Sequence, residues 1–265
     1  MEILGIRIDN FSKKEILEKI EFFLIEPKPG TISNEKVRGK FHQIATVNPE
    51  FILQAQKDED FKNILNSCDL NVADGVGIWY AFIRNFSFLK SRIAGVDLLD
   101  EIFNVANSKK LNIYLAINKN GLSKYEEIKI ALLKKYPDLK ISGADMDVAG
   151  HWPASLRQAD VSASRGGSLV TGCEILICNF GAPMQEKFIN SAKNDTIKLA
   201  MGVGGSLDFL TGKAKRAPKL MRFLGLEWLW RLLKHSSTNK KFALNRLKRI
   251  FNSVVVFPMK VLINK

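Results

Sequence analysis

The sequence predicts an α/β fold: a Rossmann-like, mainly parallel sheet with helices on both faces, followed by a basic amphipathic C-terminal helical appendage. Short β-rich runs alternate with helical patterns through most of the chain, which is typical of parallel strands joined by crossover helices. The excess positive charge lies entirely in the last fifth of the chain. We therefore expect a Rossmann-like domain over residues 1–212 and a membrane-associating appendage over residues 213–265.

The strands are expected where short apolar and β-branched runs are bounded by turn residues. They are Ile3–Ile8, His42–Val47, Leu70–Ala73, Leu111–Ile117, Leu139–Ser142, Glu174–Phe180 and Ile197–Val203. The first helix begins at a capping box of Ser12 and Glu15 and reaches about Leu24, and Asn48 and Pro49 form the start of the second. Further helices are expected at Val76–Arg84, Val96–Asn107, Leu122–Lys135, Gln185–Ala192, Lys219–Leu233 and Asn239–Ile250.

Two polar, glycine- and proline-containing stretches interrupt this alternation. Pro27–Lys40 is predicted to be a loop, and Gly143–Gly172 a long irregular segment.

Composition excludes several classes of protein. With 46% hydrophobic and 25% charged residues, the chain is neither disordered nor collagenous. Its three cysteines, Cys68, Cys173 and Cys178, lack CxxC spacing, so a disulfide framework and a structural zinc site are both unsupported. No secretory signal and no apolar run of bilayer length are present. We expect a cytoplasmic protein that does not cross a membrane.

The C-terminal segment has the composition of a membrane-surface element. From Lys213 to Lys265 there are 14 Lys and Arg and one acid, Glu227, so this segment carries the whole net charge of +13. Its cations alternate with apolar residues and with Trp228, Trp230 and other aromatic side chains. An anionic membrane surface is therefore favoured over a helix that only packs on the domain. Nucleic acid is not expected as a partner, because its binding arms seldom carry so much aliphatic surface.

The loops after the predicted strands carry the candidate site residues, because ligands of open α/β sheets bind outside the carboxyl ends of the strands. Thr46 lies at the end of the second strand and Asn48 follows it, where Asn48 also suits a helix N-cap. Asp74 follows the third strand and precedes Gly75. A carboxylate at that position suits a general base, and it also suits a helix cap.

Two further patterns carry weaker signals. Gly202, Gly204 and Gly205 follow the last strand, but a complete GxGxxG motif and a Walker lysine are absent. Asp145-Met146-Asp147 has the spacing of a carboxylate metal site, yet Asp58-Glu59-Asp60 shows that such pairs recur by chance. We expect no metal. A Rossmann-type nucleotide-dependent oxidoreductase and a non-catalytic membrane-surface protein remain as alternative classes.

Six motifs in order resemble the WecG/TagA/CpsF glycosyltransferase family. They are Thr46–Glu50, Ala73–Gly77, Arg92–Asp97, Gly181–Glu186, Gly202–Gly205 followed by Arg216-Ala217-Pro218, and Gly225–Leu232. The resemblance covers about residues 40–235. Two features depart from the family pattern: Met184 stands where Lys is usual, and Ala144–Thr171 does not follow it.

The resemblance implies an inverting, metal-independent glycosyltransferase without a cofactor. Its donor would be a UDP-sugar, N-acetylmannosamine or its uronate. Its acceptor would be undecaprenyl-diphosphate-linked N-acetylglucosamine at the inner face of the cell membrane, in cell-wall or surface-polysaccharide synthesis. The peripheral location agrees with the basic, aromatic tail. Homo-oligomerisation is left open.

The resemblance also assigns roles to individual residues. Asp74 would be the general base, with Thr46 and Asn48 holding the acceptor sugar or orienting the aspartate. Arg92 and Gln185 would contact polar groups of donor or acceptor. Gly202, Gly204 and Gly205 would let the backbone come close to the nucleotide. Arg216 and Arg231 would stabilise the charge of the diphosphate. The alternative for Arg231 is an ion pair with Glu227.

Overall fold

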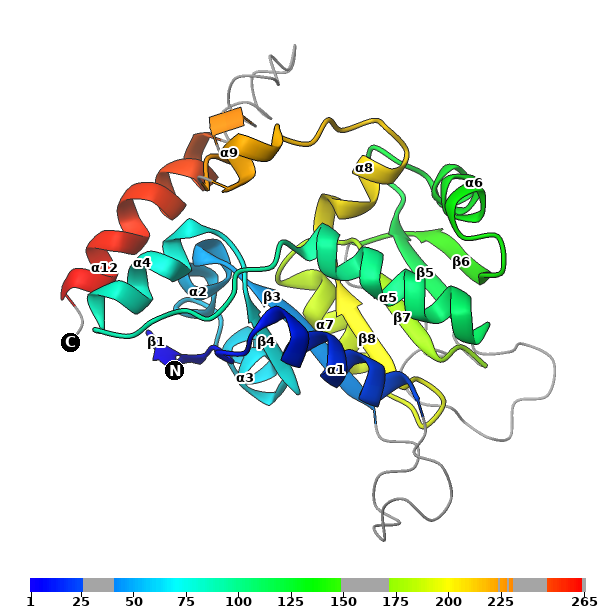
Figure 1. Cartoon of the computed structure of the whole chain (residues 1–265), viewed down its shortest axis with the longest axis horizontal. Helices are drawn as coiled ribbons and strands as arrows, with labels where there is room; N and C mark the ends of the chain where they lie inside the picture. The colour runs from blue at the N-terminus through cyan, green and yellow to red at the C-terminus, as the bar shows by residue number, and fades with distance from the viewer. Residues whose placement is uncertain (26–40, 149–171, 224, 228, 231–246, 264–265) are drawn as a thin grey trace, which may run out of the picture.

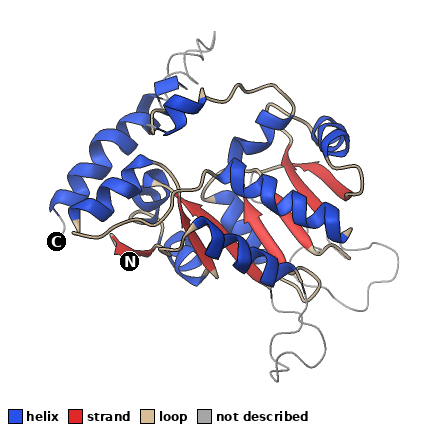
Figure 2. Cartoon of the chain, in the orientation of Figure 1, coloured by secondary structure: helices blue, strands red, loops and turns tan. Residues whose placement is uncertain are grey.

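The computed structural model describes residues 1–25, 41–148, 172–223, 225–227, 229–230 and 247–263. Six parallel strands form the central sheet in the order β4-β3-β8-β7-β5-β6, with helices on both faces (Figures 1 and 2). The strands are β3 (His42–Val47), β4 (Leu70–Ala73), β5 (Asn112–Asn118), β6 (Lys140–Met146), β7 (Ile175–Cys178) and β8 (Leu199–Gly202). The expected α/β, Rossmann-like architecture is confirmed.

The helices follow the strands along most of the chain. They are α1 (Lys13–Leu24), α2 (Pro49–Ala55), α3 (Glu59–Ser67), α4 (Val76–Arg84), α5 (Gly95–Lys109), α6 (Tyr125–Lys135), α7 (Met184–Ser191), α8 (Leu207–Leu210), α9 (Lys219–Phe223) and α12 (Phe257–Ile263), with a π-helical turn at Asn252–Val256. The capping box at Ser12 and the N-cap at Asn48 are confirmed. The short helices α3 and α8 were not anticipated from the sequence.

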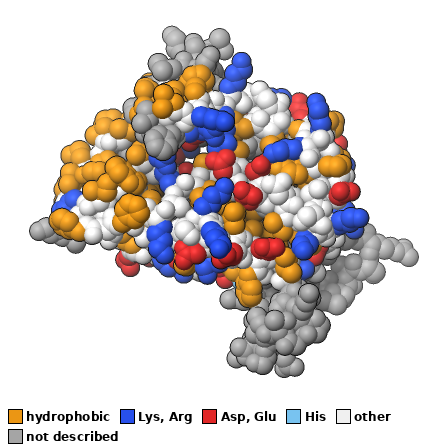
Figure 3. All heavy atoms as spheres, in the orientation of Figure 1, with side chains coloured by type: hydrophobic (Ala, Val, Ile, Leu, Met, Phe, Trp, Pro, Cys, Tyr) orange, Lys and Arg blue, Asp and Glu red, His pale blue; other side chains and the backbone are white. Residues whose placement is uncertain are grey.

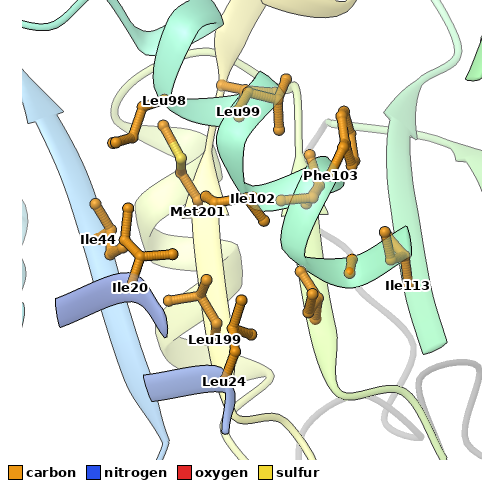
Figure 4. Close-up of a cluster of buried hydrophobic side chains, with 14 of the residues drawn as sticks. Ile20, Leu24, Ile44, Leu98, Leu99, Ile102, Phe103, Ile113, Leu199 and Met201 are labelled. Carbon is orange, nitrogen blue, oxygen red and sulfur yellow. The ribbon is translucent and has the colours of Figure 1, made fainter. Parts of the chain in front are cut away.

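The strands other than the edge strand β6 are buried on both faces, which is why they appear in the sequence as largely apolar runs. On one face, α1 and α5 pack against the middle of the sheet, where Ile20, Leu98 and Ile102 meet Ile44 and Met201 (Figure 4). On the other face, separate apolar clusters lie under α2, α3 and α4 and under α7. Packing on both faces holds the strands in place, and the loops at their carboxyl ends are held with them.

Three predicted elements need correction. Ile3–Ile8 is not one strand but an antiparallel hairpin of β1 (Glu2–Ile3) and β2 (Ile6–Arg7). Its two turn residues, Leu4 and Gly5, both have positive φ (+48° and +75°), the backbone of a tight hairpin turn. The irregular segment expected from Gly143 begins instead with four more residues of β6, because they pair in parallel register with β5.

The expected helix Lys219–Leu233 is interrupted. Helix α9 ends at Phe223, and Gly225 follows with φ +74°. The Leu226 N–H donates to the Met221 carbonyl. This hydrogen bond is typical of the Schellman motif, in which a helix ends at a glycine. Pro27–Lys40, most of Gly143–Gly172 and most of Asn239–Ile250 lie outside the described residues.

The C-terminal helix packs on the domain along one side. Phe257 is fully buried and Val261 nearly so, in the apolar cluster of α2 and α4. Gly77 of α4 lies against the Phe257 ring, and its lack of a side chain is required by Pro49, because a Cβ there would be 2.4 Å from the Pro49 ring. Within the described part of the chain, every helix is too short or too polar to span a bilayer.

Candidate active site

Two cavities lie side by side at the carboxyl ends of the central strands. The sheet-end cavity, about 590 Å³, lies over β3, β7 and β8 and is lined by Thr46, Gln185 and Gly202–Ser206. The appendage cavity, about 430 Å³, lies between the starts of α2, α4 and α5 and the C-terminal segment. Asn48, Asp74 and Ala94 line both cavities. Glu50 and Glu227 also line both, so the site has two compartments with three carboxylates at their junction, of which Asp74 is the one at a strand end.

Asp74 is placed by the parallel pairing of β3 and β4. Its backbone N–H donates to the Val47 carbonyl at 2.9 Å, which continues the strand pairing to the edge of the cavities. Gly75 follows with φ +84°, a conformation that glycine adopts at little cost, and turns the chain into α4. Gly75 is the N-cap residue of α4, so the N-cap residue itself supplies no side-chain hydrogen bond to this helix. The position suits a general base acting between two substrates.

Thr46 and Asn48 flank this carboxylate from β3. Asn48 has both predicted properties: its Oδ1 accepts from the N–H groups of Glu50 (2.9 Å) and Phe51 (3.1 Å), and it lines both cavities. Thr46 is 8% exposed and lies against the start of α5, where a Cβ on Gly95 would be 3.2 Å from its Oγ1. The structure thus places Thr46, Asn48 and Asp74 at the same strand ends, and their roles in the site stay predictions.

Gln185 is used to hold the loops of the sheet-end cavity. Its Oε1 accepts from the N–H of Gly181 (3.0 Å) and from the N–H of Gly204 (2.9 Å). Its Nε2 donates to Glu186 at 2.7 Å. A Cβ on Gly202 would lie 2.5 Å from that Nε2, so the close approach at Gly202 is made by Gln185. Gln185 therefore links the loop after β7 to the loop after β8.

Glu186 is a buried acid that the sequence did not single out. It is 1% exposed, and burial raises its pKa to about 7. One carboxylate oxygen accepts from Gln185, and the other has no hydrogen-bond partner in the described structure. Because Oε1 of Gln185 accepts two backbone donors and Nε2 donates to Glu186, the orientation of the carboxamide is fixed from both ends.

Two arginines fasten the C-terminal segment to the domain. Arg216 forms a two-bond ion pair with Asp97 of α5, at 2.7 and 2.6 Å. The Arg216 guanidinium holds the pKa of Asp97 below its ordinary value. Arg92 donates to the Arg222 carbonyl at 2.8 Å. Both predicted arginines line the appendage cavity, whereas Arg231 lies outside the described residues.

The structure adds residues that sequence reasoning missed. Arg249 forms an ion pair with Glu50 of α2 at 2.6 Å, and both line the two cavities. Arg222 and Glu227 also line the appendage cavity. Arg222 and Arg249 gave no local signal, because basic residues are frequent throughout the tail. Glu50 and Glu227 belong to the family-like motifs, but no role in the cavities was predicted for them.

The cavities suit a phosphorylated ligand. Helices α4 and α5 both begin at the cavities without a side-chain cap, and the N-terminal end of a helix carries partial positive charge. Gly204, with φ +48°, exposes backbone in the sheet-end cavity, and no atom lies within 4 Å of where its Cβ would be. A diphosphate could therefore be bound by helix N-termini and arginines.

The Asp145-Met146-Asp147 pattern lies elsewhere, on the edge strand β6. Asp145 accepts from the Tyr125 N–H, and Asp147 pairs with Lys119. Neither aspartate lines the two cavities. In the described ranges, no group of three or more His, Cys, Asp or Glu side chains is arranged to hold a metal.

A strand-end carboxylate between two cavities, with helix N-termini beside it, suits the transfer of a group between two substrates. The chain belongs to the WecG/TagA/CpsF family of glycosyl transferases, whose family model matches residues 1–256. It is therefore a glycosyltransferase, and the oxidoreductase and non-catalytic alternatives are set aside.

Two curated relatives carry the same name, N-acetylglucosaminyldiphosphoundecaprenol N-acetyl-beta-D-mannosaminyltransferase. The protein of Bacillus subtilis (strain 168) is 34% identical over 223 residues, covering 81% of this chain and 82% of the relative. The protein of Staphylococcus aureus (strain MRSA252) is 30% identical over 236 residues, covering 88% and 84%.

Proposed function

We propose that this chain transfers N-acetylmannosamine from a UDP donor to undecaprenyl-diphosphate-linked N-acetylglucosamine, with inversion at the anomeric carbon and without a metal. The observation that carries the proposal is the place of Asp74 at the junction of two cavities. Direct transfer requires one base between donor and acceptor, and this is where such a base would act. The acceptor and the transferred sugar follow the names of the relatives.

In the proposed reaction, the Asp74 carboxylate accepts the proton of an acceptor hydroxyl. The hydroxyl oxygen forms a bond to the anomeric carbon of the donor, and the bond from that carbon to the β-phosphate oxygen breaks. UDP leaves with the bonding electron pair, and the helix N-termini of α4 and α5 stabilise its charge. Arg92 and Arg216 line the adjoining appendage cavity and supply further positive charge from the other side of the junction.

We assign the donor nucleotide to the sheet-end cavity and the acceptor to the appendage cavity. The sheet-end cavity has the glycine-rich loop after β8, where backbone can approach a nucleotide. The appendage cavity is lined partly by Ile250 and Val254, which belong to the apolar C-terminal segment. A lipid-linked acceptor would reach Asp74 from that side.

The same arrangement supports a peripheral location on the inner face of the cell membrane. The segment from Lys213 onward carries the net positive charge of the chain. Each Lys or Arg near an anionic leaflet contributes about 1 kcal/mol of binding. In this proposal the appendage both completes the acceptor cavity and brings it to the membrane.

The test compares Asp74→Asn with the wild-type chain on UDP-N-acetylmannosamine and a short-chain soluble acceptor, with products identified by mass spectrometry. Loss of a general base typically lowers the rate by about 10²–10⁴-fold. Asp145→Asn is the matched control, because Asp145 lies outside both cavities, and it is expected to keep wild-type turnover. Near wild-type turnover of Asp74→Asn would overturn the assignment.

A further inference from the structure

The Rossmann-like domain carries exposed apolar side chains of its own beside the C-terminal helix. Four of them project from α4 and the loop that follows it: Trp79, Ile83, Phe86 and Phe88. Phe86 is 97% exposed and Phe88 is 80% exposed. Scattered apolar residues on a surface are ordinary, but a cluster of large ones marks an interaction site.

The C-terminal segment extends this cluster. Helix α12 packs against α4 and exposes Met259, Leu262 and Ile263, and Phe251 is exposed just before the π-helical turn that precedes α12. The two helices end at the same end of the molecule (Figure 1), and Figure 3 shows hydrophobic side chains gathered over it. We call these eight side chains the α4–α12 surface.

The loop that carries Phe88 is fixed to the domain. Asn10 donates from Nδ2 to the Phe88 carbonyl and accepts at Oδ1 from the Lys90 N–H, both at 2.8 Å. Leu89 is buried between them in the chain. Phe88 therefore projects into solvent from an anchored backbone. Because this loop is already ordered, less conformational entropy is lost when it binds a partner.

Phe86 occupies a position where glycine is normally favoured. Phe86 directly follows Asn85, the C-cap residue of α4, and has φ +52°. Its N–H donates to the Ile83 carbonyl at 2.9 Å. A bulky residue in this left-handed conformation is strained. Because the Phe86 ring is exposed, packing within the chain does not offset this strain. The strain and the exposure together indicate a contact outside the chain.

The charge around this surface has one sign. Residues 76–96 and residues 247–263 contain no acid and six cations: Arg84, Lys90, Arg92, Lys248, Arg249 and Lys260. Two acids from neighbouring elements, Glu15 and Glu50, pair with Lys90 and Arg249, and six cations against these two acids leave the charge positive. A symmetric contact with a second copy would bring like charges together, whereas an anionic lipid surface complements them.

We infer that the α4–α12 surface contacts an anionic lipid bilayer, so that the Rossmann-like domain supplies half of the membrane contact and the appendage the other half. The purpose of this contact rests on the proposed function. Ile250 and Val254 line the appendage cavity from the same helical segment, so docking here places the cavity beside the lipid-linked acceptor.

The first experiment uses the full chain with Phe86→Gly and Phe88→Ser, sedimented with phosphatidylglycerol-containing vesicles and with pure phosphatidylcholine vesicles. Phe22→Ser with Ile130→Ser is the control pair, since Phe22 and Ile130 are exposed apolar residues on α1 and α6. We expect about tenfold weaker binding to the anionic vesicles for the first pair only. Glycine suits φ +52°, so the fold should be retained.

Three outcomes would overturn the inference. They are wild-type vesicle binding by the Phe86/Phe88 pair, equal loss by the control pair, and a change from dimer to monomer by ultracentrifugation, which would assign the surface to a second copy. Turnover on a soluble acceptor is measured in parallel and should stay at the wild-type value. Absence of turnover in the wild-type chain would refute the proposed function without touching the vesicle result.

A second measurement does not depend on removing any aromatic side chain. All three native cysteines are buried, so an introduced Ser87→Cys can be labelled selectively with an environment-sensitive fluorophore. Its emission should shift to the blue on anionic vesicles, while a label at Ser108→Cys, at the end of α5, should not shift. An unchanged spectrum at position 87 would overturn the inference.

Discussion

Gly202→Ala tests the link that Gln185 makes between the two loops of the sheet-end cavity. A Cβ at Gly202 would lie 2.5 Å from Nε2 and 2.6 Å from Cδ of Gln185. Atoms that are not covalently bonded cannot lie this close together, so the Gln185 carboxamide must move. The movement breaks its hydrogen bonds with the N–H groups of Gly181 and Gly204 and with Glu186.

The magnitude follows from burial. Overpacking a filled site costs about 1–3 kcal/mol, and a buried polar group left without its partner adds roughly 1–3 kcal/mol. Gln185 is 2% exposed and Glu186 is 1% exposed, so water cannot replace their mutual bond, whereas Gly181 and Gly204 border the cavity. We expect the free energy of unfolding to fall by about 3 kcal/mol, which lowers Tm by roughly 6–12 °C for a chain of this size.

The assay is urea unfolding followed by far-UV circular dichroism, with Gly205→Ala as the control. The nearest atom to a Cβ at Gly205 is Oδ2 of Asp208 at 3.4 Å, which is ordinary contact. Its unfolding free energy should therefore change by less than about 1 kcal/mol. If Gly202→Ala is as stable as Gly205→Ala, the Gln185 link does not hold these loops.

Three further predictions concern charge. Because burial raises the pKa of Glu186 to about 7, its contribution to stability is fully present below about pH 4.5 and is lost as pH rises through 7. Glu186→Gln should remove this loss, about 3 kcal/mol, and make unfolding in urea less dependent on pH between 5 and 8. Asp97→Asn should loosen the segment around Arg216 and speed tryptic cleavage after Lys215 by roughly fivefold, the size expected for a half-exposed ion pair. Treatment with a chelator should leave sugar transfer unchanged, because the arginines and helix N-termini are proposed to stabilise UDP.

Each of these has a control and a contrary result. For Glu186, the matched substitution is Glu126→Gln on the surface of α6, and parallel pH curves for Glu186→Gln and the wild-type chain would contradict the raised pKa. For Asp97, the control is Glu101→Gln on the same helix, because Glu101 pairs with Lys13 and not with Arg216; equal cleavage rates in the two variants would show that the ion pair does not anchor the segment. Activity lost to the chelator and restored by Mg²⁺ or Mn²⁺ would refute metal independence.

The sequence by itself determined the class of fold and the core of the site. Strands buried on both faces must be apolar throughout, so their positions are visible as continuous runs. Residues that follow parallel strands meet at one edge of the sheet, so Thr46, Asn48 and Asp74 could be placed together from their positions alone. The helix starts at Ser12 and Asn48 were also local decisions, since a cap depends on neighbouring residues.

Tertiary structure alone decided the contacts between segments distant in the chain. Arg216 meets Asp97, Arg249 meets Glu50, and Phe257 is buried against α4, and no local pattern specifies such partners. The extension of β6 past Ser142 likewise depends on pairing with β5, because propensity alone does not favour a strand through Gly143. The use of Gln185 to join two loops could be recognised only once strand order had placed β7 beside β8. These features arise from long-range packing, whose free energy depends on which surfaces the fold brings together.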